Sequence, residues 1–482
     1  MRIQKGKYIL LPLKSNSSNS TQASSDEDEE GTAKAEAEFL KRSDKFRAKV
    51  SVALRGYKPR RCYHTPCKLG KRLVCCVFAA FMVPWFLFMI LNDLSSRHFF
   101  DLTDALSDWS FDISRNVTDY VLPYNDTTLL EPRHICQEKL FLLIMVCSSM
   151  RNFVERQTIR ETWANITEFN YGQFEQLHAH LKDKYYPVKQ QRIEFYKDYL
   201  KLQGNQTTTN LPPNLPVRIL FLVGRSRGEH LEGNETLWRI RQEAEQYDDI
   251  IQENFIDTYN NLTVKSVMAL KWIINNGCHQ QAAFFMKCDD DTFVNVPNLL
   301  HFLLGGTIPL YNDTLDFYDQ HSIKLLHTSA GRLNATIKYL VGHKFCSVRP
   351  VENVSSKWYM PSYMYPGDKY PTYLSGAGYM MSMDLVPELY MAALNTSLIY
   401  LEDVYITGMC AQRAHLRRVH HPLFSYKNSK KLCTFKGTII SHGIKEDNMY
   451  MAYNAVANIS NRCSPPGKYF KFIRLQKKND CD

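Results

Sequence analysis

The chain has 482 residues, of which 44% are hydrophobic and 22% charged, and its formal net charge is +10. Residues 1–72 hold 17 Lys and Arg against 8 Asp and Glu, whereas the remaining 410 hold 42 against 41. The basic excess therefore belongs to the N-terminal tail, and the balanced remainder shows no concentrated basic face that would predict nucleic-acid binding.

The N-terminal part is predicted to be a cytosolic tail followed by a membrane-spanning helix. Residues 1–72 include a stretch, SNSSNSTQASSDEDEEGTAKAEAE, that is too poor in apolar residues to fold. Residues 73–91 are nineteen residues without a charge, which suits a bilayer core of about 30 Å at about 1.5 Å per residue. A cleaved signal peptide fits less well, because the apolar run begins late and is long. Basic residues before the span and acidic residues after it predict a type II orientation.

The part of the chain after the span carries marks of the secretory pathway. It contains eleven Asn-x-Ser/Thr acceptor sites for N-glycosylation: Asn116, Asn125, Asn165, Asn205, Asn234, Asn261, Asn312, Asn334, Asn353, Asn395 and Asn458. It also contains nine cysteines, most of which should pair in an oxidising compartment; at least one is left free or bridges to another chain. We expect a lumenal stem over residues 92–134 and a folded lumenal domain over 135–482, and a homodimer stays open.

Apolar runs and amphipathic segments alternate within the predicted lumenal domain. Such alternation predicts an α/β fold with a mixed, mostly parallel sheet and right-handed crossovers. The apolar runs, which predict buried strands, are residues 139–149, 217–224 and 282–287. The helical patterns are residues 152–163, 235–254, where the helix runs into a short strand, and 261–277, which ends at Gly277. Ligands of such sheets bind at the carboxyl ends of the strands.

Three aspartates, Asp289, Asp290 and Asp291, follow the third predicted strand. Alternate residues of an extended chain point the same way, so Asp289 and Asp291 can converge while Asp290 faces elsewhere. Two converging carboxylates suit a hard divalent cation, Mn²⁺ or Mg²⁺, of the kind that also holds substrate phosphates. Considered without its context, the triplet is also compatible with an acidic surface turn or a helix cap.

Six sequence blocks, in the same order along the chain, resemble the β-1,3-galactosyltransferase family, glycosyltransferase family 31. The blocks are RQTIRETW (156–163), FLVG (221–224), DTYNNLTVKS (257–266), KCDDDTFVN (287–295), YPTYLSGAGYMMS (370–382) and EDVYITG (402–408). The resemblance covers roughly residues 136–460. It implies a GT-A fold in a type II Golgi membrane protein. The implied reaction is the metal-dependent, inverting transfer of galactose from UDP-galactose to the 3-hydroxyl of a terminal sugar, making a β-1,3 bond.

The resemblance also assigns roles to the acidic residues. Asp291 is the first choice of metal ligand, with Asp289 beside it and Asp290 helping to hold metal or ribose. His442 matches a histidine that completes the metal shell in related enzymes, although a lone histidine is more often structural. The metal would offset negative charge on the UDP leaving group.

Inversion in one step requires a base opposite the leaving group, and the resemblance makes Asp403 that base. Glu402 would orient the acceptor, and partial burial could raise the pKa of Asp403 toward neutrality, as a base requires. A capping box or a buried carboxylate pair is the alternative explanation for this pair.

Basic and aromatic residues complete the predicted substrate site. Arg156 and Arg160, four apart on a helix, either approach the nucleotide or pair with carboxylates. Lys265 either partners the aspartates or lies on a solvated helix face. Acceptor or donor-sugar contacts are expected from Trp358, Tyr373, Gly376 and Gly378, with core packing as the alternative. For Tyr379 core packing is preferred.

Two segments exceed the usual family length, residues 164–215 and 305–345, and insertions of this kind can set acceptor choice. The blocks do not separate galactose from N-acetylglucosamine, so a β-1,3-N-acetylglucosaminyltransferase that uses UDP-N-acetylglucosamine stays an alternative. A non-catalytic sugar-binding membrane protein would require a broken metal site or a missing base. A calcium-dependent adhesion protein would require more acidic loops than this single cluster.

Overall fold

The computed structural model describes residues 109, 112–202, 211–226, 233–318, 332–333, 335–428, 431–457, 463–466 and 481. The predicted cytosolic tail, the membrane-spanning segment 73–91 and the first part of the stem lie outside these residues. Among the described residues, no helix has the length and apolar character to cross a bilayer. The membrane anchor therefore stays a prediction from the sequence.

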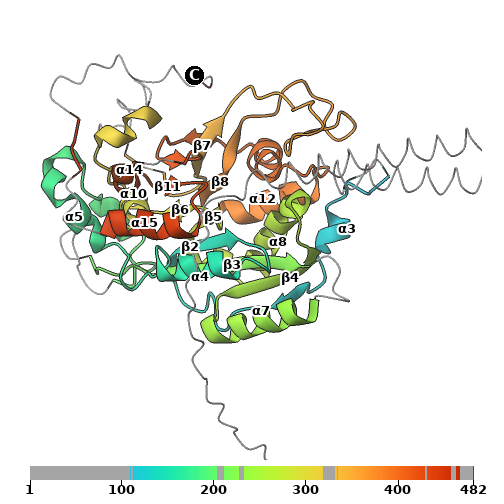
Figure 1. Ribbon diagram of the computed structural model, residues 1–482, viewed down its shortest axis with the longest axis horizontal. Helices are drawn as coiled ribbons and strands as arrows, with labels where there is room; N and C mark the ends of the chain where they lie inside the picture. Colours follow the sequence, from blue (N-terminus) through green and yellow to red (C-terminus); the bar gives the residue numbers. More distant parts are fainter. Residues whose placement is uncertain are drawn as a thin grey trace, which may run out of the picture. The chain divides into compact units, whose positions relative to one another are not determined.

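A mixed eight-stranded sheet organises the domain, in the order β1-β4-β3-β2-β5-β8-β7-β9 (Figure 1). Four neighbouring strands in its middle are parallel, namely β4 (Ile250–Ile256), β3 (Val217–Arg225), β2 (Leu140–Cys147) and β5 (Ala282–Asp289). The predicted strands at 139–149, 217–224 and 282–287 are confirmed as β2, β3 and β5. The predicted α/β fold with a mixed, mostly parallel sheet is thus confirmed.

Shorter and antiparallel strands extend this parallel block on both sides. The strands are β1 (Thr128–Leu130), which runs antiparallel to β4, and β8 (Tyr373–Ser382), β7 (Leu340–Phe345) and β9 (Arg418–His420) beyond β5. Residues 340–345, predicted to end the second insertion, therefore belong to the scaffold. A second sheet has three short strands, β10 (Phe424–Ser425), β11 (Ile440–Ser441) and β6 (Phe293–Val294).

Helices cover both faces of the large sheet, so its central strands are buried on both sides (Figure 1). Along β2, Leu142, Ile144 and Val146 pack into one core and Leu143 and Met145 into the other. This alternation explains why β2 is a continuous apolar run and not an alternating one. The first core receives α4 (Phe153–Glu161), α7 (Gly233–Tyr247), α10 (Val296–Leu303) and α15 (Glu446–Ala457). The second receives α8 (Leu262–Asn275), α12 (Leu385–Leu394) and η6 (Val404–Cys410), which is a π-helix.

Short helices make up most of the remaining regular structure. They are α3 (Thr118–Val121), α5 (Gln173–His178), η1 (Ala179–Lys184), α6 (Gln190–Phe195), η3 (Tyr259–Asn261), α9 (Cys278–Gln281), η4 (Asn312–Phe317), α13 (Ala411–Arg413) and α14 (Leu432–Gly437). Three of them, α5, η1 and α6, lie in the predicted first insertion, which is helical as expected. The predicted helices at 152–163 and 261–277 are confirmed as α4 and α8, and Gly277 follows α8 with a left-handed φ of 68°.

Six of the nine cysteines after residue 92 form disulfides, as an oxidising compartment predicts. The pairs are Cys136–Cys278, Cys346–Cys481 and Cys433–Cys463, and the buried Cys147, Cys288 and Cys410 are free. Among the predicted glycosylation sites, the structure describes exposed side chains at Asn116, Asn125, Asn312, Asn353 and Asn395 and half-buried ones at Asn165 and Asn261. Asn205, Asn334 and Asn458 lie outside the described residues, as does the side chain of Asn234.

Candidate active site

The three aspartates lie where β5 ends, beside the carboxyl end of β2. Cys147 of β2 is in register with Asp289 of β5, so the two parallel strands finish level with each other. The turn after β5 is closed by Thr292, whose amide donates to the Asp289 carbonyl and whose hydroxyl donates to the Ala377 carbonyl. The acidic turn is therefore held between β5 and β8 at the edge where α/β proteins bind ligands.

His442 joins two of these aspartates from a segment about 150 residues further along the chain. Strand β11 pairs with β6 so that Ser441 lies opposite Phe293, and the Ile444 amide donates to the Asp291 carbonyl at 2.8 Å. Gly443 has a φ of 73°, in the left-handed region that favours glycine. The small sheet thus turns the chain immediately after His442 and fixes its side chain beside the aspartates.

Asp289, Asp291 and His442 form a cluster able to hold a metal ion, since one ligand atom from each lies within 4.8 Å of the others. His442 Nε2 lies 3.3 Å from Asp291 Oδ1 and 4.0 Å from Asp289 Oδ2. Asp291 Oδ1 is buried and accepts no hydrogen bond from any residue that the structure describes. Burial raises the pKa of Asp291 although His442 lowers it. An unsatisfied buried oxygen facing a second carboxylate and an imidazole fits a divalent cation that accepts oxygen and nitrogen ligands.

Asp290 points away from this cluster, as the alternation along an extended chain predicts. Its Oδ2 accepts hydrogen bonds from Ser148 Oγ at 2.7 Å and Asn152 Nδ2 at 2.8 Å. Burial raises the pKa of Asp290, and the two hydrogen bonds oppose that rise. The residue therefore anchors the acidic turn to the end of β2, and the predicted contact with metal or ribose is not part of this geometry.

Lys287, which the sequence analysis did not select, provides a buried positive charge beside the aspartates. Its Nζ lies 2.6 Å from Asp289 Oδ1, 2.8 Å from the Gly376 carbonyl and 3.5 Å from Glu402 Oε2. Burial by itself would lower the pKa of Lys287, but Asp289 and Glu402 outweigh it and hold that pKa well above its usual value. Lys287 lies two residues before Asp289 on the same side of β5, a spacing that could have identified it.

Asp403 lies at the start of η6 with both carboxylate oxygens held by backbone amides. Oδ1 accepts from the Val404 amide at 2.8 Å and Oδ2 from the Gly376 amide at 3.1 Å. Burial raises the pKa of Asp403 to about 6, with the neighbouring charge of Glu402 adding to the rise. The carboxylate caps the helix, as one alternative had it, and its pKa near neutrality also suits a general base.

Gly376 brings strand β8 close to this carboxylate. A Cβ atom at Gly376 would lie 3.4 Å from both Asp403 Cβ and Glu402 Oε2, which is ordinary van der Waals contact, so the hydrogen bond from the Gly376 amide to Asp403 does not itself require glycine. A Cβ at Gly378 would lie 2.8 Å from Ile440 Cδ1. Gly378 therefore serves the packing of β8 against β11, which is the core-packing alternative for this residue.

Glu402 is buried and fully engaged by its neighbours. Its Oε1 accepts hydrogen bonds from Tyr379 OH at 2.7 Å and Ser266 Oγ at 2.9 Å, and its Oε2 faces Lys287. This geometry favours the buried-pair alternative over direct contact with an acceptor. Tyr379 is 2% exposed, in agreement with the preferred core-packing assignment.

The two arginines predicted to approach the nucleotide pair with carboxylates. Arg156 is 0% exposed, and its guanidinium contacts Glu243 at 2.8 and 2.6 Å. Arg160 contacts Asp249 through two 2.8 Å hydrogen bonds and Glu243 at 2.7 Å. These three ion pairs join α4 to α7, through Glu243, and to the residue before β4, Asp249. The structure thus favours the carboxylate-pairing alternative, because the guanidinium groups are already occupied.

Lys265 reaches the acidic turn only through intermediates. Its Nζ lies 2.7 Å from Asp257 Oδ1 and donates to the Ser148 carbonyl at 2.6 Å. Ser148 in turn donates its hydroxyl to Asp290. Lys265 is 2% exposed, so the solvated-face alternative is wrong, and its ion-pair partner is Asp257 and not one of the three aspartates.

Aromatic residues form a rim near the two acidic groups. Trp358 and Tyr259 are 54% and 46% exposed, and Lys357 Nζ lies 4.8 and 5.9 Å from their ring centroids. Burial raises the pKa of Tyr259 to about 12, with contributions from Asp403 and Asp289. Burial and Asp403 likewise raise the pKa of the half-buried Tyr373. Exposed aromatic faces at this position can stack on sugar rings, and Tyr259 had escaped the sequence analysis although it lies in the block DTYNNLTVKS.

Comparison with known proteins gives the same family as the sequence blocks. Residues 203–319 and 316–422 match the family model described as Galactosyltransferase. Beta-1,3-galactosyltransferase 1 of Homo sapiens is 27% identical over 365 residues, covering 75% of this chain and 88% of that protein.

Two further relatives carry different donor sugars in their names. Lactosylceramide 1,3-N-acetyl-beta-D-glucosaminyltransferase A of Danio rerio is 29% identical over 391 residues, covering 78% of this chain and 83% of that protein. Beta-1,3-galactosyltransferase 2 of Pongo abelii is 27% identical over 384 residues, covering 78% and 73%. Together with the ordered blocks and the acidic edge of the sheet, these matches show that the chain belongs to the β-1,3-galactosyltransferase family, glycosyltransferase family 31.

Proposed function

We propose that this protein is a metal-dependent, inverting β-1,3-hexosyltransferase with a GT-A-type catalytic domain. Its donor is UDP-galactose, and its acceptor is the 3-hydroxyl of a terminal N-acetylglucosamine, N-acetylgalactosamine or galactose on a glycoprotein or glycolipid. The observation that carries the proposal is that Asp289, Asp291 and His442, which could hold a metal ion, lie beside Lys287, and that Gly376 accepts from Lys287 and donates to Asp403, the base with a pKa of about 6. Lys287 links the two places, because its ammonium group contacts the candidate metal ligand Asp289 and also Glu402, the neighbour of Asp403.

The chain's residues divide the reaction between two places. Asp289, Asp291 and His442 would hold a Mn²⁺ or Mg²⁺ ion, which supplies positive charge to the diphosphate of the departing UDP. Asp403 takes the proton of the acceptor hydroxyl while that oxygen bonds to the anomeric carbon of the sugar. The bond from that carbon to UDP breaks in the same step, so the configuration inverts.

The surroundings of Asp403 keep it ready for this task. The amides of Val404 and Gly376 hold the carboxylate in one orientation, and burial keeps its pKa close to neutral pH. Glu402 is fixed by Ser266 and Tyr379 and acts on the base through its charge. Trp358 and Tyr259 provide exposed aromatic faces for the acceptor sugar.

A second donor has direct support from the comparisons. The Danio rerio relative is named as an N-acetylglucosaminyltransferase, so UDP-N-acetylglucosamine is the alternative donor for this chain. A location in the Golgi membrane, an anchor at residues 73–91, the lumenal orientation and a homodimer are further parts of the proposal that rest on the sequence.

The test is UDP release by the detergent-purified full chain with Mn²⁺, using UDP-galactose and UDP-N-acetylglucosamine separately against β-linked acceptors. We expect release with UDP-galactose, and Asp403→Asn should lower kcat by about 10²–10⁴-fold while leaving donor binding unchanged. Release with the other donor only would move the function to the alternative. Absence of release with both donors, or full turnover by Asp403→Asn, would contradict the proposal.

A further inference from the structure

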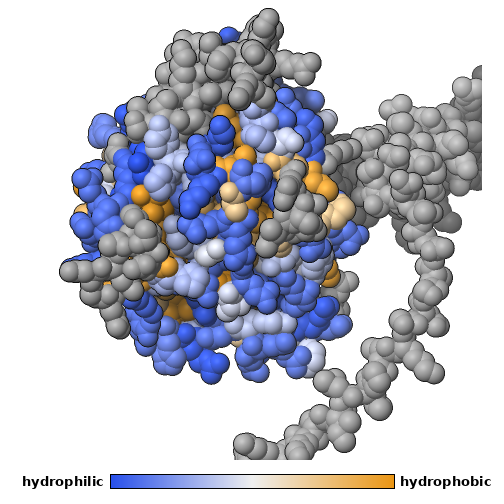
Figure 2. Space-filling view, turned by 90° about the vertical axis from the view of Figure 1, so that its left-hand side faces the viewer, coloured by the Kyte–Doolittle hydropathy of each residue, from blue (hydrophilic) through white to orange (hydrophobic). Residues whose placement is uncertain are grey.

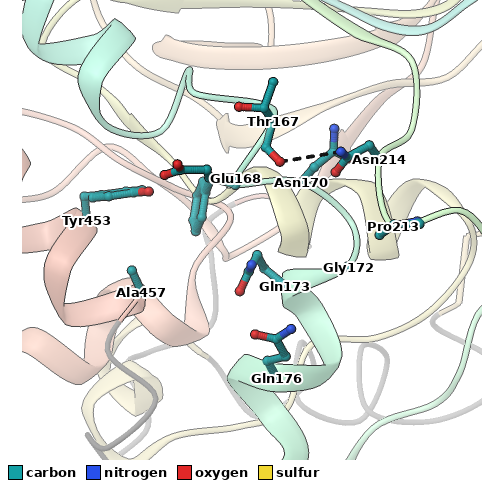
Figure 3. A pocket seen from close by; sticks show the side chains of 11 residues that line it. Thr167, Glu168, Asn170, Gly172, Gln173, Gln176, Pro213, Asn214, Tyr453 and Ala457 are labelled. Atoms are coloured by element: carbon teal, nitrogen blue, oxygen red, sulfur yellow. Dashed lines mark hydrogen bonds between the residues drawn. The ribbon is translucent and has the colours of Figure 1, made fainter.

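A cavity of about 670 Å³ lies between α5 and α15, and none of its lining residues belongs to the acidic turn or to the other candidate active-site residues. Figure 3 shows Gln173 and Gln176 of α5 on one side of this hollow and Tyr453 and Ala457 of α15 on the other. The segments that precede and follow the helices complete the lining with Thr167, Glu168, Phe169, Asn170, Gly172, Pro213 and Asn214. Its volume falls in the range of about 300–1,000 Å³ that is common for small-molecule sites.

Several polar groups in this cavity are free to bind a ligand. The side-chain amides of Gln173 and Gln176, the Glu168 carboxylate and the Tyr453 hydroxyl make no hydrogen bond to another described residue. Asn170, by contrast, is engaged by the Ile166 and Leu215 carbonyls and forms part of the wall. The cavity thus combines a fixed wall with four unpaired polar groups, both donors and acceptors, that surround one space.

The chemistry of the lining selects a class of ligand. The described lining residues include no Lys, Arg or His, so nothing in the cavity would offset the charge of a phosphate, sulfate or sialic acid. The amides, the phenol and the carboxylate would be left unpaired by a lipid tail. A neutral ligand with many hydroxyl groups satisfies both restrictions, since hydroxyls donate to carboxylates and accept from amides.

The surrounding surface also fits a polar ligand. Figure 2 views the domain from the side on which α5 lies in Figure 1, and hydrophilic residues cover most of this face with small hydrophobic patches between them. Pro213 and Tyr453 add apolar area to the cavity itself. Apolar patches beside free amides are the combination on which a sugar ring can pack and hydrogen-bond at once.

Helix α15 connects the cavity with the segment that carries His442. Helix α15 begins at Glu446, shortly after His442, and Tyr453 lies about 10 Å further along its axis. The lining residues other than Pro213 and Asn214 lie outside residues 203–319 and 316–422, which match the family model. The helical segment 164–215 therefore builds most of the cavity, largely outside the residues that match the family model.

We propose that this cavity is a second carbohydrate site, which binds a short neutral oligosaccharide through Gln173, Gln176, Glu168 and Tyr453. Such a site would hold a distal part of a glycan-bearing acceptor and raise the effective concentration of its reacting end. The binding step itself is independent of the proposed transfer reaction.

Saturation-transfer NMR on the detergent-purified full chain tests the proposal, with N-acetyllactosamine and N,N′-diacetylchitobiose as probes. EDTA is present throughout to remove divalent cations from the aspartate-histidine cluster. We expect a saturation-transfer signal from at least one neutral probe, and about tenfold weaker binding of that probe in Gln173→Ala/Gln176→Ala. Each neutral hydrogen bond contributes about a two- to tenfold factor. The matched control is Gln412→Ala, an exposed glutamine on α13, which should bind as the parent does.

Other variants separate the alternatives. Asp403→Asn should keep full probe binding. In the parent protein, probe binding without UDP release would refute the proposed function and not the second site, whereas UDP release without probe binding would refute the second site alone. Equal binding by the double glutamine variant, or stronger binding of 3′-sialyllactose than of lactose, would overturn the proposal.

Asn165 lies beside the cavity, and Thr167 Oγ1 donates to its Oδ1. Binding seen only in Asn165→Gln would also overturn the proposal, because the protein's own glycan would then fill the cavity.

Discussion

Two regions of this domain bury polar groups in opposite ways. The acidic edge, defined by Asp289, Asp291, His442, Lys287, Glu402 and Asp403, retains charged groups and one unsatisfied carboxylate oxygen. The histidine cluster, defined by His178, His301, Phe174, Tyr311 and Asn298, joins the helical segment 164–215 to α10 with neutral groups. Both nitrogens of His178 are hydrogen-bonded, whereas His301 Nδ1 has no hydrogen-bond partner among the described residues.

The side chains of the histidine cluster contact one another and serve packing. His178 accepts from Tyr311 OH at 2.6 Å through Nδ1 and donates to Asn298 Oδ1 at 2.8 Å through Nε2, which is the pattern of a neutral ring. His301 stacks on Phe174 with centroids 3.6 Å apart. Burial lowers the pKa of each histidine to about 3.

The contrast teaches where function constrains this fold. Buried charges cost free energy unless they are paired, so a region that only needs packing is expected to avoid them. The acidic edge keeps them, and its remaining unsatisfied oxygen faces the other candidate metal ligands. Buried polar atoms without a hydrogen bond also occur elsewhere, His301 Nδ1 among them, so what distinguishes the acidic edge is the convergence of an unsatisfied carboxylate oxygen, a second carboxylate and an imidazole, which suits a cation.

The largest expected effect comes from removing a ligand of the acidic edge. Asp291→Asn should lower metal-dependent transfer on the order of 10³-fold, since a bound cation supplies several kcal/mol of charge stabilisation. Initial rates over a Mn²⁺ titration measure it, and Asp183→Asn, an exposed acidic residue on η1, serves as the control. A variant with undiminished metal-dependent turnover would remove Asp291 from the metal site.

The second effect concerns the buried cation of the same edge. Lys287→Met should lower the free energy of unfolding by about 3–5 kcal/mol, because Glu402 and Asp289 lose their partner inside the protein. Urea denaturation measures the change, with Lys182→Met on the exposed surface as the control. A loss below about 1 kcal/mol would mean that the edge tolerates unpaired charge and would weaken the contrast.

The histidine cluster should respond to acid. Because the folded-state pKa of about 3 lies below the unfolded value of about 6.5, the unfolded chain takes up protons first as the pH falls. The free energy of unfolding should therefore decline between pH 6.5 and 3, by at most about 1.4 kcal/mol per pH unit for each histidine.

Denaturation curves at several pH values measure this decline. His178→Gln/His301→Gln should flatten it relative to the parent, whereas His415→Asn, which changes an exposed ring, should not. An unchanged slope in the double variant would show that these rings titrate in the folded protein and that the cluster is not neutral.

The smallest effect is a shift in the pH dependence of turnover. Below about pH 6, protonation of Asp403 should lower kcat/KM about tenfold per pH unit, since only the carboxylate accepts a proton. Lys287 lowers the pKa of Asp403, so the acidic limb of Lys287→Met should move to higher pH. Rate profiles on both sides of pH 6 with saturating Mn²⁺ check this, and a limb that moves to lower pH would contradict the assignment.

The elements of this fold were predictable because their signals are local. The apolar runs that became β2, β3 and β5 and the periodic segment that became α8 are set by side-chain spacing within each element. The opposite directions of Asp290 and its neighbours followed from strand geometry. The single charged residue Lys287 within an apolar strand was an available signal that the sequence analysis did not use.

The partners of the charged residues were decided by tertiary structure. Arg156 and Arg160 share a helix face, as predicted, but only the packing of α7 and β4 brings Glu243 and Asp249 to them. Lys265 finds Asp257, and Glu402 is enclosed by Ser266, Tyr379 and Lys287. Local spacing contains no information about which distant carboxylate a cation will meet.

By itself the sequence determined the α/β class, the acidic turn at a strand end and, through ordered blocks, the family. Only the tertiary structure brought His442 to within 3.3 Å of Asp291 and placed Gly376 against Asp403. The cavity between α5 and α15 also exists only in the folded chain. The physical reason is that periodicity and turn chemistry act between neighbours along the chain, whereas a site requires the convergence of segments that the packing of the sheets and helices joins.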